Sequence, residues 1–388
     1  MPTPNLAYVA QGRLHLQDGA ATPRVLESAF GRSLRERAAQ IHNRNVWKTQ
    51  GFGAQFMGLG QRMACEAEEL LPIWLTSVTR GAAPGEVLYA LETPEISGVF
   101  AIDENGFERR LFHTADFRVR SVAVHPDGSA IALSVAHSNM VANLAILNGD
   151  GSDLREVSEG DSFDMAPHWR PGPGRRLVFQ SAGLGTDSAG RASGQGPFAI
   201  QQLDLDSSEL QCLAEDPEFD HLGPQMTEDG TLYYIRRPYG SKPKSNTPLA
   251  ALKATLLMPF HLGFGILSFL TLFSALYTRK RPDWMNGAQN QNTVDQIRVW
   301  GETIVVSRGK KEKRDDGDAP SLVPSTWQLI RQSGSAKDVL ADGILSFDIA
   351  GDGAILYSNG RAVHRYDPNG GGKKRIFVGD KIEQVAAL

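Results

Sequence analysis

A short pattern recurs along this chain and constrains its fold more than any other feature. An aromatic residue stands eleven positions before a glycine in four places, which begin at Trp74, Phe117, Phe163 and Phe219. A short apolar stretch follows each aromatic residue, and a second one, rich in β-forming residues, follows each glycine. Four-stranded units that recur about every 40 to 50 residues are typical of the blades of a β-propeller. We therefore expect an all-β propeller, formed by residues 1–388 as a single domain.

The apolar runs predict a meander of four strands in each repeat. Second strands are expected after the glycines, at 87–90, 131–134, 177–180 and 232–235. Third and fourth strands are expected in pairs, at 99–102 with 110–113, 144–147 with 154–157, and 199–203 with 210–213. Two weaker copies lack the leading aromatic residue: Gly301 and Gly353 precede 304–307 and 355–358, with third strands at 327–330 and 363–366.

The two ends of the chain together predict one further blade. Residues 382–388 look like a first strand without successors, whereas 6–9, 13–16 and 24–26 look like strands two to four. A blade shared between the termini would close the ring and leave no unpaired edge at the seam. Counting this blade and the weaker copies gives seven blades. Six blades also fit, because the copy at Phe219 shows only two convincing strands before it is interrupted.

Two of the repeats resemble a known family. His125-Pro-Asp-Gly128 is followed by Ser-Ala-Ile-Ala-Leu-Ser, and Arg170-Pro-Gly-Pro-Gly174 by Arg-Arg-Leu-Val-Phe-Gln-Ser. These stretches are similar to the repeat of TolB-like (WD40-like) β-propellers. The resemblance covers most of the chain outside two insertions and implies the propeller fold. It does not imply one function, because such propellers serve as docking platforms, as gates on peptidases and as sugar-processing enzymes.

Composition bears on partners and location. A formal net charge of −4 gives no general attraction to nucleic acid, so we expect no nucleic-acid partner. Cys65 and Cys212 have neither the density of a disulfide scaffold nor a CxxC spacing, and a reducing compartment fits them. The first ten residues show no secretory signal, in contrast to TolB, which is exported. We therefore expect a protein that faces the cytosol.

The most apolar part of the chain interrupts the repeats within 242–290. Residues 254–278 contain no Asp, Glu, Lys or Arg, and a stretch of this length could span a bilayer, which takes roughly 20 residues. A single crossing would place blades on opposite sides of the membrane, and basic residues flank both ends. Pro259, Gly263 and Gly265 would break a helix near the middle. The pattern therefore favours a re-entrant hairpin with arms at about 249–258 and 266–277.

We predict that 249–281 holds the protein on the cytosolic face of a membrane, as a peripheral or monotopic protein whose partner is membrane lipid. The expected membrane-contacting residues are Leu256, Leu257, Phe260, Leu262, Phe264, Ile266, Leu267, Phe269, Leu270, Phe273, Tyr277, Arg279, Lys280, Arg281 and Trp284. The three basic residues among them would pair with anionic headgroups, and Tyr277 and Trp284 would lie at the interface. Alternatively, the same hairpin packs against a partner protein.

A second insertion is expected at 28–72 and begins with a helix. Ser28 is suited to the N-cap, and apolar residues recur at helical spacing at Phe30, Leu34, Ala38 and Ile41. Arginines occupy the opposite face. A glycine-rich loop at 51–60 and a second helical stretch at 61–71 follow. This element either contacts a membrane or partner, or it caps the propeller with its arginines in solvent.

The chain carries no linear motif of a catalytic or metal site. The sequence lacks a nucleophile elbow, a Walker-type loop, an HExxH motif and an EF-hand loop, so we predict no catalytic residue, metal or cofactor. Propeller enzymes, however, gather side chains from separate blades around the axis. The candidates for such a channel site are Asp164, His168, Asp220 and His221. The alternative is that the aspartates accept hydrogen bonds in turns and the histidines pack in the core.

These observations favour an interaction scaffold, in which a propeller face binds an unidentified protein partner and the hairpin holds the complex at the membrane. One alternative is a propeller-type hydrolase or lyase with a site at the central channel, which an axial cluster of three or more carboxylate or histidine side chains would favour. Another is an accessory subunit of a larger membrane complex, with the hairpin packed against another subunit's transmembrane helices.

Overall fold

The structure is a computed structural model that describes residues 5–19, 21–50, 71–137, 141–172, 174–186, 192–240, 295–299, 302–306, 319–368, 370 and 372–388. The chain divides into two compact units. The larger contains Met1–Ala39, Glu66–Tyr239 and Val294–Leu388, and the smaller contains Gln40–Cys65 and Gly240–Thr293. The predicted apolar hairpin, the loop at 51–60 and most of the second helical stretch lie outside the described residues. The description below concerns the larger unit.

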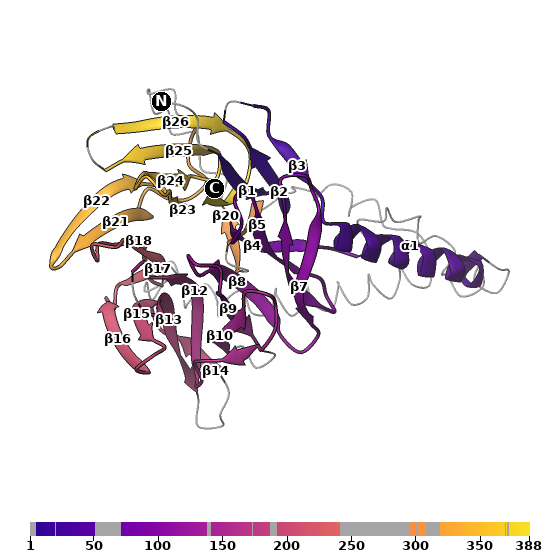
Figure 1. Cartoon of the computed structure of the whole chain (residues 1–388), viewed down its shortest axis with the longest axis horizontal. Coiled ribbons are helices and arrows are strands. Elements are labelled where there is room, and N and C mark those ends of the chain that lie inside the picture. The colour runs from indigo at the N-terminus through magenta and orange to yellow at the C-terminus, as the bar shows by residue number, and fades with distance from the viewer. Residues whose placement is uncertain are drawn as a thin grey trace, which may run out of the picture. The chain divides into compact units, whose positions relative to one another are not determined.

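The strands of this unit form antiparallel meanders, as the repeat predicts (Figure 1). One sheet has the order β4 (Trp74–Arg80), β5 (Val87–Glu92), β6 (Ser97–Ile102), β7 (Glu108–Thr114). The next two repeats are joined into one sheet, because β10 and β12 pair in parallel where Ala142 lies opposite Phe163. This sheet consists of β8 (Arg118–Val124), β9 (Ala130–Ala136), β10 (Ala142–Asn148), β11 (Arg155–Glu156), β12 (Ser162–Trp169), β13 (Arg176–Thr186), β14 (Ala192–Gln195), β15 (Ala199–Asp204) and β16 (Glu209–Ala214).

The two ends of the chain meet in one sheet. β27 (Ile382–Ala387) pairs with β1 (Leu6–Ala10), which is followed by β2 (Arg13–Gln17) and β3 (Arg24–Leu26). In the antiparallel register, Leu6 lies opposite Ala387. The prediction that a C-terminal strand joins three N-terminal strands is confirmed.

The strand pairing corrects the predicted repeat at Gly301. β19 (Asp295–Val299) and β20 (Glu302–Val306) form a two-stranded sheet of their own. The predicted third strand at 327–330 belongs elsewhere, because β21 (Gln328–Ser333) pairs with β18 (Leu232–Pro238). The repeat that begins at Phe219 is therefore completed beyond the insertion, in the order β17 (Phe219–Met226), β18, β21, β22 (Ala336–Asp342). The remaining sheet has the order β23 (Ser346–Ile349), β24 (Ile355–Ser358), β25 (Ala362–Asp367), β26 (Gly372–Val378).

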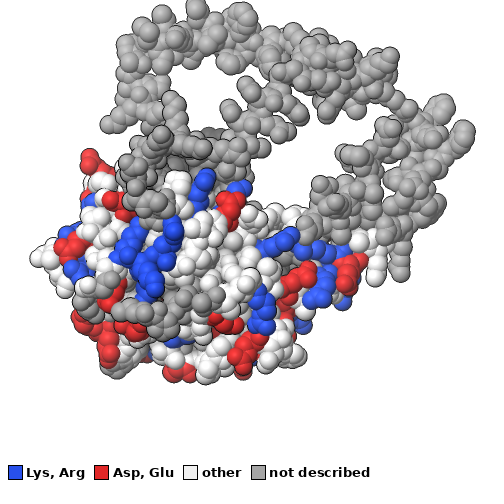
Figure 2. All heavy atoms as spheres, turned by 90° about the horizontal axis from the view of Figure 1, so that it is seen from above, with Lys and Arg blue, Asp and Glu red and all other residues white. Residues whose placement is uncertain are grey.

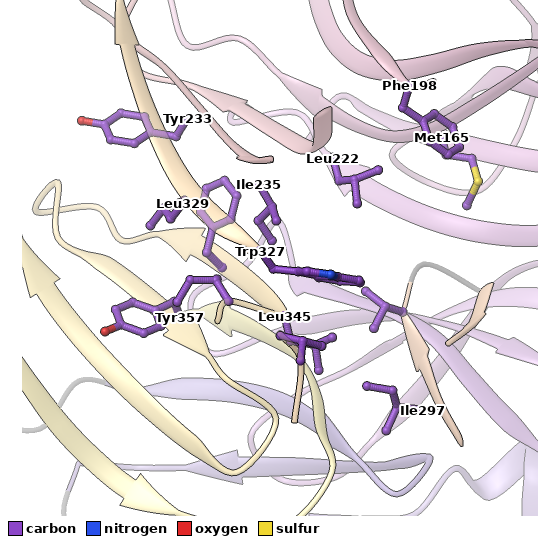
Figure 3. Packing of buried hydrophobic residues seen from close by; sticks show 14 of the residues in the cluster. Met165, Phe198, Leu222, Tyr233, Ile235, Ile297, Trp327, Leu329, Leu345 and Tyr357 are labelled. Atoms are coloured by element: carbon purple, nitrogen blue, oxygen red, sulfur yellow. The ribbon is translucent and has the colours of Figure 1, made fainter. Parts of the chain in front are cut away.

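The hydrophobic core lies between neighbouring sheets. β5 and β9 are buried along their whole length, which explains why their sequences are almost continuously apolar. Figure 3 shows one cluster, in which Trp327 lies among Leu222, Ile235 and Leu345. These side chains come from β17, β18 and the segment before β23, so the core holds separate sheets together. Ile297 of the small β19–β20 sheet belongs to the same cluster.

Helix α1 (Ala29–Gln50) begins where the sequence predicts a helix. The Ser28 hydroxyl accepts a hydrogen bond from the Gly31 amide (3.0 Å), and the Glu108 carboxylate accepts one from the Phe30 amide (2.9 Å). Both contacts satisfy N–H groups that the first turn of a helix leaves unpaired. Within the described part of the chain, no helix is long and apolar enough to cross a bilayer.

The repeat glycine ends a tight turn between the first and second strands. The Gly128 amide donates to the His125 carbonyl oxygen (2.8 Å), and Gly128 has a φ of +75°. Gly230 ends the equivalent turn, donates to the Thr227 carbonyl oxygen (3.0 Å) and has a φ of +84°. A positive φ is unfavourable for residues with a Cβ atom, which explains why the pattern ends on glycine.

Substituting alanine for Gly128 and for Gly230 separates the energetic cost of backbone strain from that of steric contact. In G230A the added Cβ would meet nothing closer than a guanidinium nitrogen of Arg170 at 4.0 Å, so strain alone should lower the free energy of unfolding by about 1 kcal/mol. In G128A the Cβ would lie 2.8 Å from the Ala82 Cβ, and the loss should be larger by about 1 kcal/mol or more. Urea unfolding followed by tryptophan fluorescence measures both. Equal losses would contradict the steric contribution.

Candidate functional site

The first strands of the sheets face one another around a narrow channel (Figure 1). Its narrow part, a cavity of about 60 Å³, is lined by residues of β4, β8, β12, β17, β23 and β27, which we call the inner strands. Each inner strand contributes two or three consecutive residues: 77–79, 121–123, 166–168, 223–225, 346–348 and 384–385. A cavity of this size holds only a few water molecules.

Six hydrogen bonds among the described residues link each inner strand to the next. In each bond, a side-chain oxygen accepts from a backbone amide of the following inner strand. The accepting and donating residues are Gln384 and Val78 (3.0 Å), Ser77 and Val122 (3.2 Å), Ser121 and Ala166 (3.1 Å), Gln180 and Gly223 (2.7 Å), Gln225 and Ile349 (3.0 Å), and Asp348 and Ala387 (2.7 Å). Gln180 comes from β13, which pairs with β12, and the other acceptors come from inner strands. The sixth bond ends on β27, where the first begins.

β-Bulges in the inner strands explain several of these bonds. The register of β4, β8, β12 and β17 shifts close to Ser77, Ser121, Ala166 and Gly223 respectively. A bulge leaves a backbone group without a partner in its own ladder, and a buried amide without a partner costs about 1–3 kcal/mol. A polar side chain from the preceding repeat supplies the missing acceptor, so the bulges and the polar residues act together.

The channel widens at one end into a cavity of about 580 Å³, which we call the vestibule. The ends of the inner strands and the turns that follow them form its walls, at 79–84, 123–126, 226–228 and 348–351. The charged side chains that line it are Arg80, Glu228 and Asp348. Sites for small molecules typically enclose about 300–1,000 Å³, so the vestibule is large enough for a ligand.

Asp348 lies where the channel meets the vestibule. Its carboxylate accepts hydrogen bonds from the Ala387 amide (2.7 Å) and from the Gln225 side-chain amide (3.0 Å). Burial raises the pKa of Asp348 to about 6, although these hydrogen bonds and the positive charge of Arg80 act in the opposite direction. The guanidinium of Arg80 is exposed, and within the described residues it has no ion-pair or hydrogen-bond partner.

His168 is the predicted channel residue that the structure places at this site. It is half-buried and lines both the narrow channel and the vestibule. Burial lowers the pKa of His168 to about 4, and the charge of Arg80 lowers it further. At neutral pH the imidazole is therefore uncharged, and its buried Nδ1 atom has no hydrogen-bond partner.

The other three channel candidates line neither cavity and are buried in structural contacts. Asp164 accepts hydrogen bonds from the hydroxyl groups of Ser158 and Ser181, both at 2.6 Å. Asp220 accepts from Nε of Arg237 at 2.8 Å and from a backbone amide. The His221 ring lies edge-on to Tyr234, with centroids 4.8 Å apart.

Sequence analysis missed Arg80 and Asp348, although the repeat contains a signal for both. Each stands five positions before a repeat glycine, Gly85 for Arg80 and Gly353 for Asp348. The same position in the other repeats holds the uncharged residues Ala123, Trp169 and Gln225. Comparing equivalent positions would have identified the two charges as exceptions. No group of three or more His, Cys, Asp or Glu side chains that could hold a metal ion occurs among the described residues.

Charge also gathers on the outside of the larger unit. The outer strand β26 carries three consecutive exposed basic residues, Lys373, Lys374 and Arg375. Figure 2 looks at the molecule from above in the sense of Figure 1, where β26 lies uppermost, and shows Lys and Arg side chains clustered on this side. Lysine is common on edge strands because its charge discourages pairing with other chains.

Comparison with known proteins identifies the fold. No protein-family model matches the sequence, and no curated protein is significantly similar to it. TolB from Acinetobacter baumannii aligns with 99% of this chain at 10% identity and a TM-score of 0.51, and the match spans 65% of the TolB chain. A chain of the nidogen/laminin complex aligns at 8% identity and a TM-score of 0.52, over 99% of this chain and 98% of that one. The protein therefore has a β-propeller fold, similar to that of TolB, as the repeats predict.

Removing one acceptor of the inner-strand hydrogen bonds should destabilise the protein measurably. Ser121→Ala leaves the buried Ala166 amide without a partner, and we expect the free energy of unfolding to fall by about 1–3 kcal/mol. Ser335→Ala changes an exposed residue in the turn after β21 and should alter it by less than about 0.5 kcal/mol. Urea unfolding of both variants checks this. A loss in S121A no larger than that in S335A would contradict the importance of these bonds.

His221 should make the protein less stable in acid. Burial lowers the pKa of His221 to about 4, whereas histidine in an unfolded chain titrates near 6.5. As pH falls through this window, the unfolded chain takes up a proton that the folded chain does not, which lowers the free energy of unfolding by up to about 3 kcal/mol. His221→Gln should therefore flatten the decline between pH 6.5 and pH 4, measured by urea unfolding at several pH values. An unchanged slope would contradict the prediction.

Proposed function

We propose that the protein is an interaction scaffold, built on a closed six-bladed propeller and held at the cytosolic face of a membrane by 249–281. The observation that carries the proposal is an uncharged stretch of 25 residues, 254–278, inserted between β18 and β21 of one sheet. An apolar segment of this size needs cover by lipid or protein, and basic residues on both of its flanks suit anionic headgroups.

The strand pairing supports a ring of six blades. Each inner strand is followed by a second, a third and a fourth strand, when β27 is counted with β1, β2 and β3. The hydrogen bonds between inner strands run in one direction and return to β27. A seventh blade would need two more strands beside β19 and β20, and the candidate strand at 327–330 pairs with β18 instead.

The places where the chain leaves the larger unit also support the proposal. β18 ends at Pro238, which lies opposite Phe219, the first residue of an inner strand. In the sequence, the predicted second insertion at 28–72 is followed by Trp74, the first residue of another inner strand. The vestibule is formed by the opposite ends of the same strands. β18 therefore ends at the opposite end of its sheet from the vestibule, and we expect a partner to bind at the vestibule end.

Flotation with liposomes tests the membrane part of the proposal. The intact chain should float with vesicles that contain phosphatidylglycerol, and a variant in which a short Gly-Ser linker replaces 249–277 should stay at the bottom of the gradient. Circular dichroism should show that the variant keeps its β-structure. If neither protein floats, the membrane attachment is wrong, and the apolar segment is then expected to copurify with a protein.

A charge variant separates apolar insertion from electrostatic attraction. Replacing Arg279, Lys280 and Arg281 by glutamine removes about 1 kcal/mol of attraction to anionic lipid per residue. This variant should float less than the intact chain on phosphatidylglycerol vesicles but should still float on them. Complete loss of flotation would contradict insertion of the apolar hairpin and would indicate attachment by charge alone.

A further inference from the structure

The inner-strand hydrogen bonds need only an acceptor, which makes Asp348 unusual. In the other five inner-strand hydrogen bonds, the acceptor is an uncharged serine or glutamine side chain. Only Asp348 uses a carboxylate to do so. A charged carboxylate is costly in a poorly solvated place, and its raised pKa reflects that cost. An asparagine oxygen would serve the Ala387 amide equally well, but only the carboxylate also accepts from the Gln225 side-chain amide, and the negative charge that it carries borders the vestibule.

Arg80 provides the complementary charge in the same cavity. It lines the vestibule together with Asp348 and stands at the equivalent position of its own repeat. No hydrogen bond or ion pair ties its guanidinium to any described residue, and it forms none with Asp348. The vestibule thus presents one positive side chain, Arg80, and two acidic ones, Glu228 and Asp348, and Arg80 does not neutralise Asp348 by direct contact.

The surroundings of the two groups suit a small polar molecule. The walls between them consist largely of glycine, alanine and proline, including Pro84, Pro126 and Pro171, whose rigid backbones keep the cavity open. His168 adds an uncharged imidazole at the base of the vestibule. Perturbed pKa values in a cleft are frequent at functional sites.

We propose that the vestibule binds a small zwitterion, with its carboxylate on Arg80 and its ammonium group on Asp348, as in a free α-amino acid. A guanidinium binds a carboxylate through two parallel hydrogen bonds, and a carboxylate accepts from an ammonium group. A simple anion would face Asp348 and Glu228, and a simple cation would face Arg80. A zwitterion satisfies both charges at once. This inference goes beyond the scaffold function and does not depend on membrane attachment.

Calorimetric titration of the full chain tests the proposal with defined probes. The probes are glycine, L-alanine, L-leucine, L-glutamate, L-lysine and glycylglycine, each at up to about 10 mM. At least one should bind, and its N-acetylated and C-amidated forms should each bind at least ten-fold more weakly. If no probe binds, or if blocking either charged end leaves the affinity unchanged, the proposal is overturned.

Substitutions locate the site. Asp348→Asn keeps an acceptor for the Ala387 amide but removes the charge, and Arg80→Gln removes the guanidinium from an exposed side chain. Each should weaken binding at least ten-fold while circular dichroism stays close to that of the unaltered protein. The urea midpoint should stay the same in R80Q and fall in D348N, which loses the acceptor of the Gln225 side-chain amide. Asp161→Asn, an exposed aspartate outside both cavities, should bind normally. Unchanged affinity in D348N would overturn the assignment, and R80Q gives an independent result if D348N is unstable.

Discussion

The larger unit depends on hydrogen bonds that link successive inner strands around the channel. Bulges in β4, β8, β12 and β17 disturb the ladders of these strands, and polar side chains from neighbouring repeats supply acceptors to their amides. Hydrophobic packing between the sheets would tolerate small sliding movements, because apolar contacts are not directional. The hydrogen bonds are directional, and they therefore fix how far each inner strand is displaced relative to its neighbour.

The same constraint explains where a binding site can form. The narrow part of the channel is occupied by the groups that make these bonds, and it has room for little more than water. Beyond it, the strands diverge into their turns, and side chains at the strand ends are free to serve a ligand or a partner. Arg80 and Asp348 stand at this boundary. Asp348 both accepts an inner-strand hydrogen bond and lines the vestibule. A ligand bound to it would therefore act directly on the contact between β23 and β27.

Local features of the sequence predicted most strands, whereas long-range features could not be predicted. The aromatic residue, the apolar run and the turn glycine act within one hairpin, which is why the first and second strands were predicted correctly. β22 and β26 were not predicted, because as outer strands they carry mostly exposed, charged residues. The pairing of β21 with β18 bridges the insertion, and no local pattern records it. At the candidate site, His168 was predicted, but Arg80 and Asp348 appear only when equivalent repeat positions are compared.

Hydrogen exchange at single-residue resolution tests the inner-strand series most directly. The amides to follow are those of Val78, Val122, Ala166, Gly223, Ile349 and Ala387. If the six hydrogen bonds close a ring around the channel, all six amides should exchange slowly and at comparable rates, because each amide opens only when neighbouring inner strands separate. If the amides of Val78 and Ala387, which connect β27 to its neighbours, exchange as fast as an exposed turn amide such as that of Ser335, the ring of hydrogen bonds is not closed.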